Sequence, residues 1–292
     1  MTEEVVKLGD IGINVKYLMM DKPVVLFIHF SGGNLNMWDG VIPLFEHDYS
    51  IIIPDIRGHG KSDKPLQGYH IDDMANDIYL LLRELKISHC HIVGSSMGAE
   101  IGLSIAASHP ELVLSLICEG AFYNEFGEYG LYNGTNEEIE GKKEAMRHEL
   151  ATRVERVYKT KDEYIEEERT RLTQEGIWTE HFLPFLENNI QQMENGNFTY
   201  CYLNRVRTEY IERYWDVTFE LYYEKVKCPI LFLPGEEEWK DESIRRHLSY
   251  FTSLLKVFEV KHIQNAVHAY MWMQSPEALG KVAKNFIDRW SL

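Results

Sequence analysis

Short, mainly apolar runs recur in the first 121 residues and return near the end of the chain. They cover residues 24–28, 51–53, 91–93, 112–118 and 230–233. Continuous runs of this length are typical of strands in a parallel sheet whose two faces are both covered. Between them, residues 71–85 carry apolar side chains at helical spacing, and residues 97–108 are rich in small and apolar types. The alternation of strand and helix predicts a doubly wound, mostly parallel α/β fold.

Residues 122–222 break this pattern. They contain a single proline, 18 of the chain's 36 aromatic residues, and helix-like stretches such as residues 137–175. The sheet pattern then returns, with strands expected over residues 230–233 and 255–260 and a last helix over residues 276–290. We therefore expect residues 1–121 and 223–292 to form the core, with residues 122–222 inserted as a helical cap over a pocket. A domain that only packs against the core is the alternative.

The composition excludes several classes of protein. Thirty Lys and Arg against 46 Asp and Glu leave a net charge of −16, which argues against nucleic-acid or anionic-membrane partners. No apolar stretch reaches the ~18 residues of a membrane span, and the acidic N-terminus lacks a signal-peptide core, so we expect a cytoplasmic protein. The four cysteines lack metal-ligand spacing, and no phosphate-loop or dinucleotide motif is present. We expect a small-molecule substrate without metal or cofactor, and leave open whether the chain forms a homodimer.

The segment Gly94-Ser95-Ser96-Met97-Gly98 lies between a predicted strand and a predicted helix. A GxSxG sequence in this context is typical of a sharp turn that lifts the central serine above the carboxyl end of a sheet. Glycines two positions to either side are needed because so tight a turn crowds the backbone. The turn also places Ser96 at a helix N-terminus, where developing negative charge is favoured. Ser96 is therefore the candidate nucleophile.

A serine hydroxyl needs a base, and the base needs a carboxylate that orients it. His268 follows the last predicted strand and precedes the last predicted helix, which makes it the candidate base. Two carboxylates, Glu238 and Glu119, each follow a predicted strand and lie between the serine and the histidine in the chain. The order of the residues and the expected sheet geometry allow either one to complete a triad.

An acyl-transfer site also needs N–H donors for the oxyanion. The glycine-rich turn HFSGG at residues 29–33 follows the first apolar run and can direct backbone amides toward the serine. The candidate donors are the amide of Ser31 and that of Met97, the residue after the nucleophile.

Taken together, these motifs resemble those of the α/β-hydrolase-fold serine hydrolases with a helical cap, and the resemblance spans the whole chain. The matching segments are HFSGG at 29–33, DIRGHGKS at 55–62 and GSSMG at 94–98, while AVH at 266–268 stands where the family has Gly-His, with Val267 in place of the usual glycine. GEEE at residues 235–238 is similar to the family's G-x-x-D acid motif, although Glu238 stands in place of the usual aspartate. Glu119 resembles the acid position of one branch, and we favour Glu238 because its loop matches the commoner pattern. Phe30 stands where the family usually has glycine.

The resemblance implies a serine hydrolase that cleaves a small carboxylic ester, thioester or lactone through an acyl-serine intermediate. The serine nucleophile also resembles that of carbon–carbon bond hydrolases, cofactor-free lyases and perhydrolases of the same fold, which are the alternative. It differs from the aspartate that haloalkane dehalogenases and epoxide hydrolases carry at this turn. A ligand-sensing regulatory protein on a hydrolase scaffold is the remaining alternative.

Overall fold

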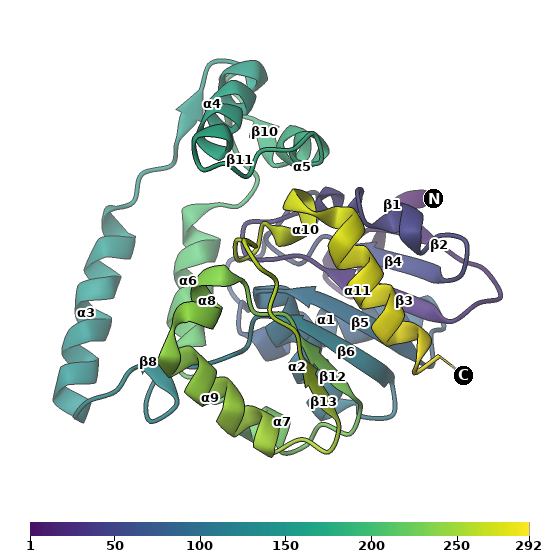
Figure 1. Cartoon of the computed structure of the whole chain (residues 1–292). Coiled ribbons are helices and arrows are strands. Elements are labelled where there is room, and N and C mark those ends of the chain that lie inside the picture. The colour runs from purple at the N-terminus through teal and green to yellow at the C-terminus, as the bar shows by residue number, and fades with distance from the viewer. Residues whose placement is uncertain (292) are drawn as a thin grey trace.

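An eight-stranded sheet lies at the centre of the computed structural model, which describes residues 1–291 (Figure 1). In order across the sheet, the strands are β1 (Thr2–Leu8), β2 (Ile11–Leu18), β4 (Ser50–Pro54), β3 (Val24–Ile28), β5 (Cys90–Ser95), β6 (Val113–Glu119), β12 (Ile230–Phe232) and β13 (Phe258–Val260). From β4 to β13 neighbouring strands run parallel, whereas β2 pairs antiparallel with both β1 and β4. This topology confirms the predicted fold class.

The apolar run of β3 is buried because side chains on both of its faces pack against helices. The helices around the sheet are α1 (Ile71–Glu84), α2 (Met97–Ser108), α8 (Glu236–Lys240), α9 (Glu242–Ser253), α10 (Met271–Gln274) and α11 (Pro276–Asp288). Leu26 and Ile28 pack in the apolar cluster that includes α1 and α2, while Val25 and Phe27 pack in the cluster that includes α10 and α11. Successive side chains of a strand point to opposite faces, so a continuous apolar run serves both layers.

The apolar runs do not predict β1 and β2. Most side chains of β1 are exposed, among them the charged Glu3, Glu4 and Lys7, so the strand carries no apolar signal. Charges on an edge strand also hinder pairing with a second chain. The predicted strand over residues 255–260 is shorter than expected and begins at Phe258.

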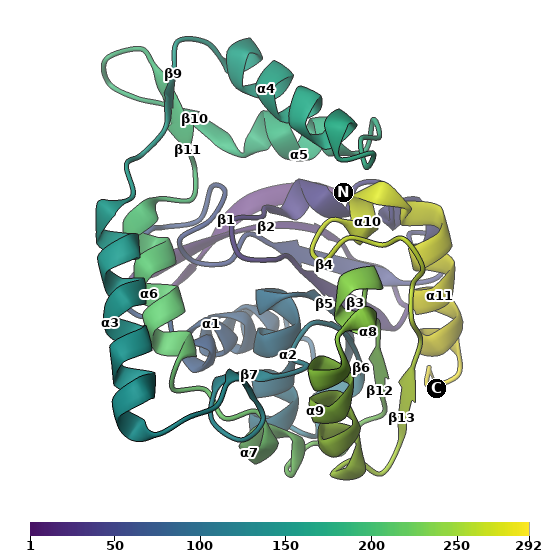
Figure 2. The same cartoon turned by 60° about the vertical axis from the view of Figure 1, so that its left-hand side comes forward.

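Residues 122–222 leave the large sheet between β6 and β12. Their elements are β7 (Asn124–Phe126), β8 (Gly130–Tyr132), α3 (Asn136–Thr152), β9 (Val157–Tyr158), α4 (Lys161–Gln174), α5 (Phe182–Asn188), β10 (Ile190–Gln192), β11 (Phe198–Tyr200), α6 (Asn204–Tyr214) and α7 (Glu220–Tyr223). Figure 2 shows α3 and α6 beside the core, and α4, α5, β10 and β11 above one end of it. We call this segment the insertion.

The helix-like stretch predicted over residues 137–175 forms two helices, α3 and α4, with a break between them. The first helix ends at Thr152, and β9 pairs with β11 before α4 begins. The Thr160 side chain accepts a hydrogen bond from the Glu163 amide at 3.1 Å and so caps α4. The insertion is therefore helical with a small three-stranded sheet of order β10-β11-β9.

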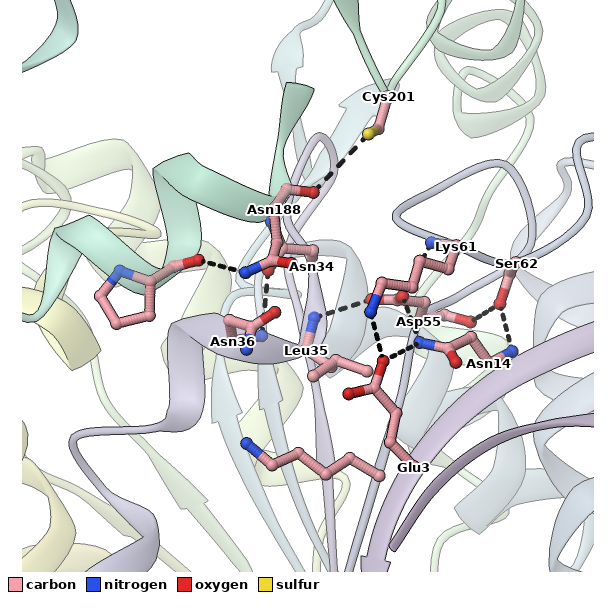
Figure 3. Close-up of polar contacts among 12 residues, drawn as sticks. Glu3, Asn14, Asn34, Leu35, Asn36, Asp55, Lys61, Ser62, Asn188 and Cys201 are labelled. Atoms are coloured by element: carbon pink, nitrogen blue, oxygen red, sulfur yellow. Dashed lines mark hydrogen bonds and ion pairs between the residues drawn. The ribbon is translucent and has the colours of Figure 1, made fainter. Parts of the chain in front are cut away.

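A buried polar network around Asp55 fixes the loop after β4 (Figure 3). The Asp55 carboxylate accepts hydrogen bonds from the Leu35 amide at 2.8 Å, the Lys61 amide at 2.9 Å and the Asn14 side chain at 2.9 Å. The Ser62 hydroxyl donates to the Asp55 carbonyl at 2.6 Å. Asp55 is saturated by backbone and side-chain donors and acts as a structural residue.

The neighbouring loop joins the core to the insertion. The Asn34 side chain donates to the carbonyl of Phe185 in α5 at 3.0 Å. Phe185 in turn packs against Phe30, with the two rings 5.7 Å apart. The turn at residues 29–33 is therefore in direct contact with the insertion. In the described part of the chain, none of the helices has both the length and the apolar character that a membrane span requires.

Candidate active site

Ser96 lies at the junction of β5 and α2 in a strained backbone conformation. Its φ is +51° and its ψ −119°, a combination that residues with a side chain rarely adopt. A Cβ atom at Gly94 would lie 2.5 Å from the Ala99 backbone, and one at Gly98 would lie 2.7 Å from the Ile28 carbonyl carbon. The two glycines allow the turn because no larger residue fits at either position.

The structure brings Ser96 and His268 together, although they are 172 residues apart in the chain. His268 lies in the loop between β13 and α10, and its Nε2 is 3.0 Å from the Ser96 Oγ. This distance allows the hydroxyl to donate to Nε2 when the imidazole is neutral. The two candidate groups are thus placed as a nucleophile and its base.

Both candidate carboxylates lie near the other imidazole nitrogen. Glu238 Oε1 is 2.9 Å from His268 Nδ1, and Glu119 Oε1 is 3.6 Å from it. The Nδ1–H direction is not well aligned with either oxygen, so the 2.9 Å approach is a close ion-pair contact and not a linear hydrogen bond. The shorter distance favours Glu238, the carboxylate that the sequence motif indicates.

The two carboxylates differ in what else holds them. Glu238, in the first turn of α8, also accepts a hydrogen bond at its Oε2 from the Gly235 amide at 2.9 Å. Glu119 is fully buried and accepts from the Ser95 hydroxyl at 2.5 Å, the Trp272 indole N–H at 2.9 Å and the Ala269 amide. Burial raises the pKa of Glu119 to about 7. Glu119 therefore joins the strand before the nucleophile to the loop that carries the histidine.

The acidic residues around His268 raise the pKa of its imidazole. Burial lowers the pKa of the imidazole, but the attraction of Glu238, and then of Glu119 and Glu100, outweighs burial and raises the pKa to about 9. The side chain remains 39% exposed, so solvent screens part of this attraction. The imidazolium is favoured in the free protein, and the neutral form that can act as a base becomes more populated as the pH rises.

The candidate oxyanion donors lie at the ends of β3 and β5. Within residues 1–291, the amides of Ser31 and Met97 donate to no protein acceptor, which leaves both available to a ligand. His29 holds the turn at residues 29–33, because its Nε2 accepts from the Ile56 amide at 3.0 Å while its Nδ1 lies 2.8 Å from the Phe30 carbonyl. An acceptor at Nε2 requires the proton on Nδ1, so this histidine is a neutral structural residue.

One buried acid near the site was not predicted. Glu100, one turn after Ser96 on α2, accepts a hydrogen bond from the Tyr210 hydroxyl at 2.8 Å, and burial raises its pKa to about 7. The available signal was a single charged residue within the otherwise small and apolar segment 97–108. Within residues 1–291, no group of three or more His, Cys, Asp or Glu side chains is arranged to hold a metal ion.

Two cavities adjoin these groups. One, of about 490 Å³, is lined by Glu238, His268 and the segment after α4. The other, of about 320 Å³, lies between the Phe30–Ser31 turn and the insertion. Residues of the insertion therefore line both cavities.

Comparison with known proteins gives the same fold. A family model of the alpha/beta hydrolase fold matches residues 23–162. The chain is 36% identical over 116 residues to a fluoroacetate dehalogenase from a Burkholderia species, a match covering 38% of each chain. It is 37% identical over 112 residues to 2-(acetamidomethylene)succinate hydrolase of Mesorhizobium japonicum, covering 38% of this chain and 40% of the relative. These matches span about two fifths of the length of the curated relatives.

Solved structures extend the likeness to nearly the whole chain. The crystal structure of E-2-(acetamidomethylene)succinate hydrolase matches with a TM-score of 0.77 at 23% identity, covering 98% of this chain and 99% of the other. A thioesterase domain from the curacin biosynthetic pathway matches with a TM-score of 0.72 at 18% identity, covering 97% and 98%. Together with the strand order described above, these matches show that the chain has the α/β-hydrolase fold.

Proposed function

We propose that this protein is a serine hydrolase that cleaves a small carboxylic ester, thioester or lactone through an acyl-serine intermediate. The observation that carries the proposal is the 3.0 Å approach of Ser96 Oγ to His268 Nε2 at a strained strand-to-helix turn. Strain in this backbone region is retained where the surrounding structure holds it, often at functional sites. The carboxylate of Glu238 at the far side of the imidazole supports the same assignment.

The geometry accounts for each step of acyl transfer. Ser96 Oγ attacks the substrate carbonyl carbon while His268 Nε2 accepts the hydroxyl proton. The amides of Met97 and Ser31 donate to the oxyanion, and the helix N-terminus of α2 stabilises its charge. The imidazolium returns the proton to the leaving oxygen or sulfur, and water activated by the neutral imidazole then releases the acid and regenerates Ser96.

A lactonase among the relatives supports hydrolysis at a carbonyl. A 3-oxoadipate enol-lactonase of Acinetobacter baylyi is 36% identical over 103 residues, covering 35% of this chain and 39% of the relative. The dehalogenase relative does not suggest its reaction here, because a serine alkoxide would leave a stable ether after displacing a halide from carbon. Ser96 favours acyl chemistry, in which the covalent adduct is an ester that water can cleave.

A fluorophosphonate probe tests the proposal. We expect stoichiometric labelling of the wild type at Ser96 and none of Ser96→Ala. Ser104→Ala, in the middle of the same helix, is the matched control and should label like the wild type. A panel of aryl esters, thioesters and lactones then separates an enzyme from a ligand sensor, since a sensor binds without appreciable turnover. Equal labelling of Ser96→Ala and the wild type would contradict the nucleophile assignment.

A further inference from the structure

The 320 Å³ cavity beside the candidate oxyanion turn has a local charge opposite to that of the whole chain. The chain carries a net charge of −16, yet the charged residues lining this cavity are Arg156, Arg171, Arg207 and a single acid, Glu168. A concave site with an excess of one charge concentrates ligands of the opposite charge. The cavity is therefore suited to an anion.

Two of the three arginines form ion pairs with carboxylates, and the third forms none within residues 1–291. Arg171 pairs with Glu168 at 2.8 Å and with Glu175 at 2.9 Å, and Arg156 pairs with Glu167 at 2.6 Å. Arg207, on α6, has no carboxylate within 4.0 Å among residues 1–291. Its guanidinium lies over the Tyr202 ring, 5.2 Å from the centroid. This contact places the guanidinium beside the aromatic ring, and within residues 1–291 no carboxylate is close enough to pair with it.

Tyr202 connects Arg207 to the candidate catalytic groups. Its hydroxyl is 2.7 Å from the Ser31 Oγ, and its ring stacks on His59 with the centroids 4.3 Å apart. The ring is almost fully buried and so forms a rigid support between α6 and the turn that holds the Ser31 amide. An anion at Arg207 therefore lies in the same cavity as the oxyanion turn.

We infer that the cavity holds the free carboxylate of an anionic acyl substrate, with Arg207 as its anchor. This inference rests on the proposed function and narrows its substrate class to the monoester, monothioester or lactone of a short acid that keeps one ionised carboxylate. The guanidinium forms two parallel N–H···O bonds with the carboxylate, a geometry that the arginine fork matches. The volume of about 320 Å³ lies at the small end of ligand pockets and limits the acyl chain to a few carbons.

A matched pair of substrates tests the carboxylate directly. The probes are the mono-p-nitrophenyl ester of adipic acid, which keeps one carboxylate, and p-nitrophenyl methyl adipate, in which that group is capped. A charge-assisted contact predicts a kcat/KM about 10- to 100-fold higher for the anionic probe. Arg207→Gln should remove this preference mainly through KM and change the capped probe by less than about threefold. Arg207→Lys should keep part of the preference, because it retains charge without the fork.

The control is Arg213→Gln, which removes the same charge from the same helix at a residue that does not line the cavity. Equal rates for the two probes in the wild type, or the same change in Arg213→Gln as in Arg207→Gln, would overturn the inference. A preference that persists in Arg207→Gln would also overturn it.

Binding separates failure of this inference from failure of the proposed function. Adipate is titrated calorimetrically into Ser96→Ala and into the double variant Ser96→Ala, Arg207→Gln. We expect at least tenfold weaker binding in the double variant. Arg207-dependent binding without turnover of either probe would support the carboxylate site and contradict the hydrolase. Turnover of both probes without Arg207-dependent binding would support the hydrolase and contradict the site.

Discussion

Replacing Glu238 and Glu119 by glutamine, one at a time, should separate a catalytic role from a structural one. Both carboxylates lie near His268 Nδ1, at 2.9 Å and 3.6 Å. At an effective dielectric constant of about 20, these distances correspond to attractions of at most about 6 and about 5 kcal/mol for the imidazolium, and solvent around the 39% exposed His268 side chain reduces both values. The shorter distance therefore favours Glu238 by only about 1 kcal/mol.

The two carboxylates differ in the hydrogen bonds that they accept. Within residues 1–291, Glu238 Oε1 contacts no donor other than His268, so Glu238→Gln leaves the imidazolium without its nearest anion. Loss of the orienting acid costs roughly 10⁴ in kcat, or about 5 kcal/mol, because the imidazole then takes the wrong tautomer and its cation is unsupported. Glu119 already accepts from Ser95, Trp272 and Ala269. Glu119→Gln turns an amide N–H toward at least one of these donors and should lower stability by about 2–4 kcal/mol.

The assay combines kcat on an aryl ester with thermal unfolding of the same samples at pH 8. We expect Glu238→Gln to lose at least 10³ in kcat with little change in Tm. We expect Glu119→Gln to lose about 5–15 °C in Tm and less than tenfold in kcat. Glu237→Gln, exposed beside Glu238, is the control and should match the wild type in both. A 10³-fold loss in Glu119→Gln at unchanged Tm, with Glu238→Gln near wild type, would refute the assignment.

Three further results are expected. The acid limb of the kcat/KM profile should have its midpoint above 6.5 and toward 9, because the raised pKa of His268 keeps the base protonated at neutral pH; a midpoint at or below 6.5 would contradict the electrostatics. Glu100→Gln should gain Tm relative to the wild type at pH 8 but not at pH 4, because the raised pKa of this carboxyl makes the folded wild type lose stability as the pH rises through about 7. Gly98→Ala should abolish fluorophosphonate labelling, since its Cβ would meet the Ile28 backbone; normal labelling would show that the turn is less crowded than described.

The parts of the fold that the sequence predicts are those in which local pattern and tertiary position agree. The apolar runs mark β3 and β5 because both faces of these strands are covered, and the glycines around Ser96 mark a turn that excludes larger residues. Strand β1 gives no such signal because its side chains remain exposed. The break between α3 and α4 depends on pairing of β9 with β11, a contact between residues 40 positions apart that helical spacing does not reveal.

The candidate site was also predictable only in part from the sequence. The spacing of motifs predicts that Ser96 and His268 follow strands whose carboxyl ends meet, and the structure places them 3.0 Å apart. The choice between Glu238 and Glu119 could not be made from strand order, because β6 and β12 are neighbours and end beside each other. The position of Arg207 depends on how α6 packs against the core through Tyr202, which no local pattern in residues 122–222 encodes.

Acyl-enzyme mapping tests the proposed mechanism most directly. The protein is mixed with an aryl ester that it turns over, quenched in acid during the steady state, digested and analysed by mass spectrometry. The mechanism predicts an acyl group on Ser96 in the wild type and its absence in Ser96→Ala, together with loss of turnover. An acyl group on another residue, or steady turnover by Ser96→Ala, would contradict it.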